Sequence, residues 1–74
     1  MIYFIGGYHR MVRDYCGQND IDPKSVRHIT DHYQVQGAVL RDGDRVIWFE
    51  DNAEIKWYLD LHDTREDKSG DIYV

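Results

Sequence analysis

The chain opens on an apolar run, Met1 to Ile5, that stops at two consecutive glycines, Gly6 and Gly7. No polar residue interrupts the run, so both faces of this segment must be covered in the folded protein. Its β-branched and aromatic side chains are typical of a strand. Strands buried on both faces lie in the centre of parallel sheets that carry helices on each side. The run therefore predicts an α/β fold in which residues 1–5 form the central strand.

A helical period follows the glycines. Apolar residues recur at intervals of three and four and form one stripe of a helix: Tyr8, Met11, Val12, Tyr15 and Cys16. The Asp22-Pro23 pair ends this segment, because a residue before proline avoids the helical conformation. Residues 26–30 form a short segment rich in β-branched side chains, which favours a second strand. Together these segments predict a βαβ unit with a right-handed crossover.

Residues 31–50 allow two interpretations. In the first, Asp31 caps a short helix through Gln36, and residues 46–49 form a third parallel strand after a second crossover. In the second, Asp42-Gly43 is the turn of a hairpin over residues 38–50, which gives an α+β fold. We favour the crossover because residues 31–36 are polar and too many for an unstructured loop.

The last helix is expected after Asp51 or Asn52, either of which can cap it. Ile55, Tyr58, Leu59 and His62 share one face, and Trp57 and Leu61 widen the apolar side. We therefore expect one domain over residues 1–61, with three mainly parallel strands in the order 2-1-3 and two or three helices, similar to Rossmann and flavodoxin-like folds. Residues 62–74 are expected to be an acidic tail, of which residues 62–71 are a solvated linker without a core residue.

The end of the tail, residues 72–74, has the composition of a short strand. It can pair with a free edge of the sheet, either in its own subunit or in a neighbour, and exchange between subunits would give a homodimer.

Charge and cysteine content limit the function classes. The net charge of −5 disfavours direct binding to nucleic acid, although residues 1–30 carry four basic and three acidic groups. Because Cys16 is the single cysteine, no intrachain disulfide can form, and we expect a cytoplasmic location. No segment is apolar for long enough to span a membrane.

The candidate ligand site lies beyond the carboxyl ends of the predicted strands, where parallel sheets bind ligands. Its residues are Gly6, Gly7, Tyr8, His9 and Arg10 at the first strand, Thr30 and Asp31 at the second, and Glu50, Asp51 and Asn52 at the third. A glycine turn before a helix can hold a phosphate, but neither common phosphate-binding fingerprint is present. The simpler interpretation is a tight turn.

Three other groups of candidate residues are better explained by structural roles than by chemistry. Asp31, Glu50 and Asp51 could converge on Mg²⁺, but capping explains Asp31 and Asp51 more simply. His28 and His32 have a spacing seen in zinc sites, but the turn between them separates them. Cys16 falls on the apolar stripe, where a free cysteine is an inert small hydrophobe. We expect no catalytic residue, metal or cofactor.

A set of residues resembles a group of small, uncharacterised actinobacteriophage proteins with a Rossmann-like βαβ core: Gly6 with Arg10, residues 21–27, Thr30-Asp31, Gly37 and residues 46–49. The resemblance covers residues 1 to about 61 and implies a phage accessory protein and a parallel sheet. The third strand is followed here by Glu50-Asp51-Asn52, where members of the group often carry paired tryptophans.

Three functions are compatible with these observations. The first is a non-enzymatic accessory module that binds a host or phage protein. The second is a minimal nucleotide- or phosphate-binding domain at the Gly6-Gly7 turn. The third is an acidic inhibitor whose carboxylates, in residues 60–71, imitate nucleic acid in front of a host enzyme.

Overall fold

The computed structural model describes residues 1–68 and 70–74 and contains one sheet of four parallel strands, in the order β2-β1-β3-β4. The strands are β1 (Ile2–Ile5), β2 (Val26–Ile29), β3 (Arg45–Trp48) and β4 (Ile72–Tyr73). Ile5 of β1 pairs with Ile29 on one side and with Trp48 on the other. The predicted central position of residues 1–5 and the order 2-1-3 are confirmed.

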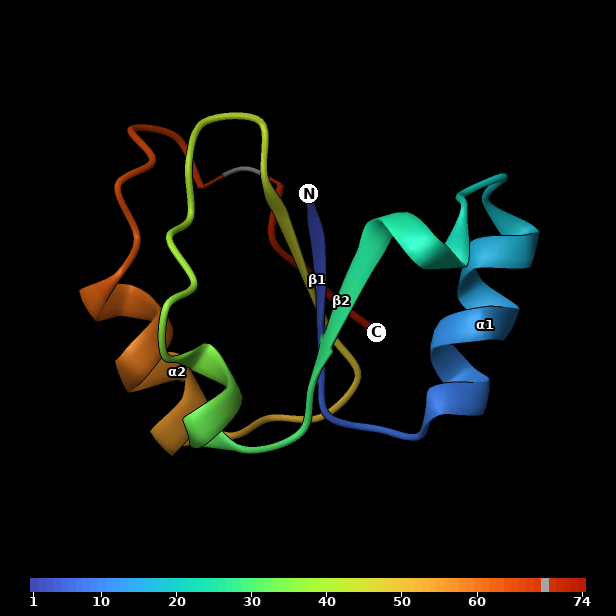
Figure 1. Cartoon of the computed structure of the whole chain (residues 1–74), viewed down its shortest axis with the longest axis horizontal. Coiled ribbons are helices and arrows are strands. Elements are labelled where there is room, and N and C mark those ends of the chain that lie inside the picture. The colour runs from blue at the N-terminus through green and yellow to red at the C-terminus, as the bar shows by residue number, and fades with distance from the viewer. Residues whose placement is uncertain (69) are drawn as a thin grey trace.

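Helices cover both faces of this sheet. Helix α1 (His9–Gln18) and the 3-10 helix η1 (Pro23–Ser25) connect β1 to β2. The 3-10 helix η2 (His32–Val35) follows β2, and helix α2 (Ala53–Leu61) follows β3. Figure 1 views the sheet along its edge, with α1 on one side and α2 with η2 on the other. The α/β class predicted from the sequence is therefore confirmed.

The hairpin alternative over residues 38–50 does not form. Asp42 and Gly43 do make a tight turn, in which the Asp44 amide donates to the Arg41 carbonyl over 2.9 Å. Strand β3, however, pairs with β1 on one side and with β4 on the other, so it has no free edge for residues 38–40. Leu40 instead forms a parallel bridge with Asp63, in the segment after α2. The crossover predicted for residues 31–36 is present, as the short helix η2.

Alternate side chains of the strands supply two cores. Tyr3, Ile5 and Trp48 face α2 and pack with Leu40 and with Ile55 and Leu59 of that helix. Phe4 and Ile47 face α1 and pack with Val12 and Cys16. Phe49 also packs on this second core, with its ring centroid 6.1 Å from that of Tyr15. Neighbouring residues Trp48 and Phe49 thus lie on opposite faces, as strand geometry requires.

The predicted helix faces are partly wrong. Tyr8 is 79% exposed and precedes α1 at the N-cap position, so the buried stripe of this helix begins at Val12. In α2, Ile55 and Leu59 are buried, but Trp57 and Leu61 are exposed. The α2 side of the sheet is already filled by η2 and Leu40, and it therefore needs only a narrow apolar stripe from the helix.

The segment after α2 is not the solvated tail without a core residue that its charges predict. Arg65 is 6% exposed, and its guanidinium lies 3.0 Å from an Asp63 oxygen and 2.9 Å from an Asp71 oxygen. The segment then enters the sheet as β4, where the Val74 amide donates to the Trp48 carbonyl over 2.8 Å. No helix in the described part of the chain is long and apolar enough to cross a membrane.

Candidate functional site

The Gly6-Gly7 turn lies at the carboxyl end of β1, as expected, but an acidic side chain lies against it. Gly6 and Gly7 have φ angles of +75° and +68°, which only glycine adopts without strain. A Cβ atom at Gly6 would overlap the side chain of Glu50, and a Cβ atom at Gly7 would lie 3.0 Å from Met11 Sδ. The carboxylate beside Gly6 makes this position electrostatically unfavourable for a phosphate.

The remaining residues of the expected site divide between the two faces of the sheet. Asp31 accepts hydrogen bonds from the Tyr33 and Gln34 amides over 2.9 and 3.2 Å and thereby caps η2. Asn52 caps α2 by accepting from the Ile55 amide over 3.1 Å. Asp51 is exposed just before this cap. These residues belong to the α2 side, whereas Tyr8, His9 and Arg10 belong to α1 on the other side.

The two histidines with zinc-like spacing are held apart. His28 Nε2 lies 2.7 Å from the Gly6 carbonyl oxygen, and it must donate there because a carbonyl only accepts. His32 stacks on Tyr58 at 5.2 Å and places Nδ1 3.2 Å from Glu54 Oε1. Within residues 1–68 and 70–74, no three His, Cys, Asp or Glu side chains are grouped to hold a metal ion.

Groups with shifted pKa values lie away from the carboxyl-end rim. Burial, followed by the charge of Asp22, raises the pKa of the Cys16 thiol, which therefore stays protonated. A hydrogen bond from Arg65 is the main cause that lowers the pKa of Asp63 to about 2. The Asp63 hydrogen bond in turn raises the pKa of Arg65. The Asp63–Arg65 pair anchors the C-terminal segment.

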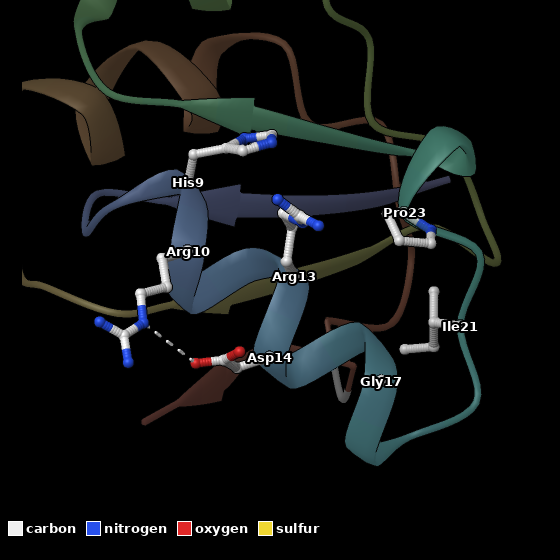
Figure 2. Close-up of a pocket in the computed structure, with 7 residues that line it drawn as sticks. All are labelled: His9, Arg10, Arg13, Asp14, Gly17, Ile21 and Pro23. Carbon is white, nitrogen blue, oxygen red and sulfur yellow. Dashed lines mark ion pairs between the residues drawn. The ribbon is translucent and has the colours of Figure 1, made fainter.

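The flank of α1 carries an open hollow of about 640 Å³ (Figure 2). His9, Arg10, Arg13 and Asp14 line it from α1, and Ile21 and Pro23 from the connection to β2. His9 and Arg10 were expected at a ligand site from their place after the glycine turn. Arg13 was not, but its position four residues after His9, one helical turn away, is a signal that the sequence does contain.

The outer face of α2 carries two exposed apolar side chains, Trp57 and Leu61. They are 58% and 62% exposed and lie four residues apart, so they are neighbours on the same helix face. The Trp57 ring meets Tyr58 edge-on, with centroids 4.8 Å apart. We call this pair the α2 ridge. The sequence placed both residues on the apolar side of the helix, but it did not show that this side faces solvent.

Comparisons with known proteins leave the family open: no family model, curated protein or solved structure matches this chain.

Proposed function

We propose that this chain is a non-enzymatic module that binds another protein through the α2 ridge. The observation that carries the proposal is the exposure of Trp57 beside Leu61 on one helix face. Tryptophan is the residue most enriched among side chains that dominate binding energy at protein interfaces. Two neighbouring large apolar side chains held toward solvent offer a partner apolar area whose burial would favour binding.

Packed residues beneath the α2 ridge hold its side chains in place, which lowers the side-chain entropy cost of binding. Ile55 and Leu59 anchor the inner face of α2 and are 1% and 2% exposed. Tyr58 contacts the Trp57 ring and is itself stacked on His32 at an interplanar angle of 13°. A side chain held in place before binding loses less rotamer freedom when the partner arrives.

The resemblance described above would make the partner a phage or host protein, and we include this origin in the proposal. The proposal also includes a homodimer formed by exchange of residues 72–74. The two other functions are less well supported. Glu50 lies against the Gly6-Gly7 turn, and Asp63 and Asp71 direct their carboxylates to Arg65 instead of presenting them to a host enzyme.

A capture experiment with matched variants tests the ridge. The full chain is immobilised and exposed to lysate of a bacterial host, in parallel with a Trp57→Ala/Leu61→Ala variant and a Tyr8→Ala variant. Tyr8 is an exposed aromatic residue on the α1 side and controls for general stickiness. We expect the captured protein to be lost with the ridge variant and kept with Tyr8→Ala. Equal capture by all three chains would contradict the proposal.

A further inference from the structure

The hollow beside α1 has unbalanced positive charge. Arg10 lies 3.9 Å from Asp14, and both side chains are largely exposed, so this pair is weak and can rearrange. Among the described residues, the guanidinium of Arg13 has no hydrogen-bond or ion-pair partner. Two arginines and one carboxylate therefore line the hollow, in a chain whose overall charge is −5. A local excess of cations in an acidic protein indicates a place for an anion.

His9 and Arg13 are arranged to act on the same ligand. They are one helical turn apart, and Figure 2 shows both side chains projecting on one side of α1, whereas Arg10 and Asp14 project on the other. The ring of His28 lies 6.3 Å from that of His9, but its Nε2 is committed to the Gly6 carbonyl. His9 and Arg13 are thus the donors available to the hollow, with Arg10 at its rim.

The floor and far wall of the hollow are open and apolar. Gly17 follows Arg13 by one turn, and, apart from its chain neighbours and the backbone of its own helix, no described atom lies within 4 Å of the position that a Cβ would take there. Ile21 is half-buried on the α1 core, and its amide donates to the Cys16 carbonyl over 2.9 Å. Pro23 begins η1 with a fixed φ angle. This wall offers a preformed surface for the carbon part of a ligand.

The geometry points to a binding site for a small phosphate ester in this hollow. The phosphate lies on Arg13 and His9, because the planar guanidinium fork matches phosphate oxygens and the imidazole supplies a further donor. The organic part lies over Gly17 against Ile21 and Pro23. The volume falls within the range of small-molecule sites. This site differs from the Gly6-Gly7 turn and does not depend on the α2 ridge.

Titration of the full chain with three small probes tests the assignment. The probes are phenyl phosphate, inorganic phosphate and benzoate, followed by calorimetry and by amide shifts in NMR spectra. We expect phenyl phosphate to bind about tenfold more tightly than either of the others, because only it has both the phosphate and the ring. The shifted amides should be those of residues 9–23. Equal binding of benzoate would overturn the preference for phosphate in favour of a carboxylate ligand.

Two substitutions and two controls separate the site from general electrostatics. Arg13→Ala should weaken phenyl phosphate at least about tenfold, as expected for loss of a charge-assisted hydrogen bond. Arg41→Ala makes the same change in net charge away from the hollow and should leave the affinity within about twofold. Equal losses with both variants, or no loss with Arg13→Ala, would overturn the proposal.

Gly17→Leu should fill the hollow and abolish binding without lowering the melting temperature, because Gly17 is helical and the space is empty. Gln18→Leu adds the same side chain to an exposed neighbouring position outside the hollow and should bind normally. Should Gly17→Leu bind phenyl phosphate as the unchanged chain does, the hollow is not the site. Absence of binding by the unchanged chain at millimolar probe would also overturn the proposal.

Discussion

Arg65 holds the C-terminal segment to the rest of the protein. Its Nε and Nη2 atoms each donate to Asp63 over 3.0 Å, and Nη1 donates to Asp71 over 2.9 Å and to the Asp44 carbonyl over 3.1 Å. The Asp63 carboxylate is as buried as the guanidinium, since each side chain is 2% exposed. One arginine therefore connects the loop before β3, the chain after α2 and the start of β4.

Removal of this guanidinium should strongly destabilise the protein. Arg65→Ala leaves the buried Asp63 carboxylate with the backbone amide of residue 65, which donates over 3.0 Å, and with Lys68, whose Nζ lies 3.5 Å away in a half-exposed position. Breaking a buried pair from one side costs about 3 kcal/mol of unfolding free energy. Arg65→Lys keeps the positive charge but loses the paired N–H donors of the guanidinium. Its unfolding free energy from urea denaturation should lie between those of the unchanged chain and of Arg65→Ala. A loss below about 1 kcal/mol for Arg65→Ala would show that the pair is not a structural anchor.

The same pair predicts how stability depends on pH. The pKa of Asp63 is about 2 in the folded protein, below its ordinary value of 3.8, chiefly because of the Arg65 hydrogen bond. Below pH 4 the unfolded chain therefore binds more protons at this residue than the folded chain. The stabilisation is complete above about pH 5, and about 2 kcal/mol of it is lost by pH 2.

Asp63→Asn tests this assignment, because an amide does not titrate in this range. Urea denaturation at a series of pH values from 5 to 2 should give a shallower decline for this variant than for the unchanged chain. Asp51→Asn, a substitution at an exposed carboxylate, is the control and should follow the unchanged chain. Parallel declines for Asp63→Asn and the unchanged chain would place the acid-sensitive group elsewhere.

At the scale of elements, local patterns were enough to predict the first three strands and their order; the fourth strand of the sheet, β4, was only one of the possibilities for residues 72–74. The uninterrupted run over residues 1–5 required burial on both faces, and β1 indeed lies between β2 and β3. Val12 and Cys16 repeat at helical spacing and are buried in α1. These features depend on periodicity within one segment, which a single sequence shows directly. The turn at Asp42-Gly43 was also visible, but its sequence did not show that β3 would have no free edge.

The features that the sequence did not reveal depend on contacts between distant segments. A run such as residues 62–71 is typical of a solvated linker when it is taken alone. Arg65 becomes a buried residue only because the fold brings Asp44 and Asp71 to it. The α1 hollow is similar: His9 and Arg10 were expected at a site, whereas Ile21 and Pro23 join them only after the chain turns back.

At the scale of the whole molecule, charge is separated along the chain. Residues 1–30, which include the α1 hollow, carry four basic and three acidic groups, whereas residues 60–74 carry two basic and five acidic groups. The α1 hollow and the α2 ridge lie on opposite sides of the sheet. A phosphorylated small molecule and a protein partner could therefore be bound at the same time without competing for one surface.

The last strand links the fold to assembly. Strand β4 pairs with β3 of its own chain, and Tyr73 stacks on Trp48 with centroids 5.7 Å apart. An exchanged strand from a second copy would make the same contacts, so we expect concentration to decide between the closed monomer and an exchanged dimer. We expect a monomer at about 10 µM and a growing dimer fraction toward about 1 mM in sedimentation experiments.

Deletion of residues 72–74 should abolish this dimer at every concentration, because the exchanged segment is absent. It should also lower the melting temperature and shift the emission of Trp48 to the red, since Trp48 is 4% exposed beneath Tyr73. A Trp57→Phe background removes the signal of the exposed tryptophan and makes the shift attributable to Trp48. A dimer that survives the deletion would contradict strand exchange and implicate another surface, of which the α2 ridge is the first to test. A full-length chain that stays monomeric at about 1 mM would also contradict exchange, while the stability loss and red shift would still report the closed strand.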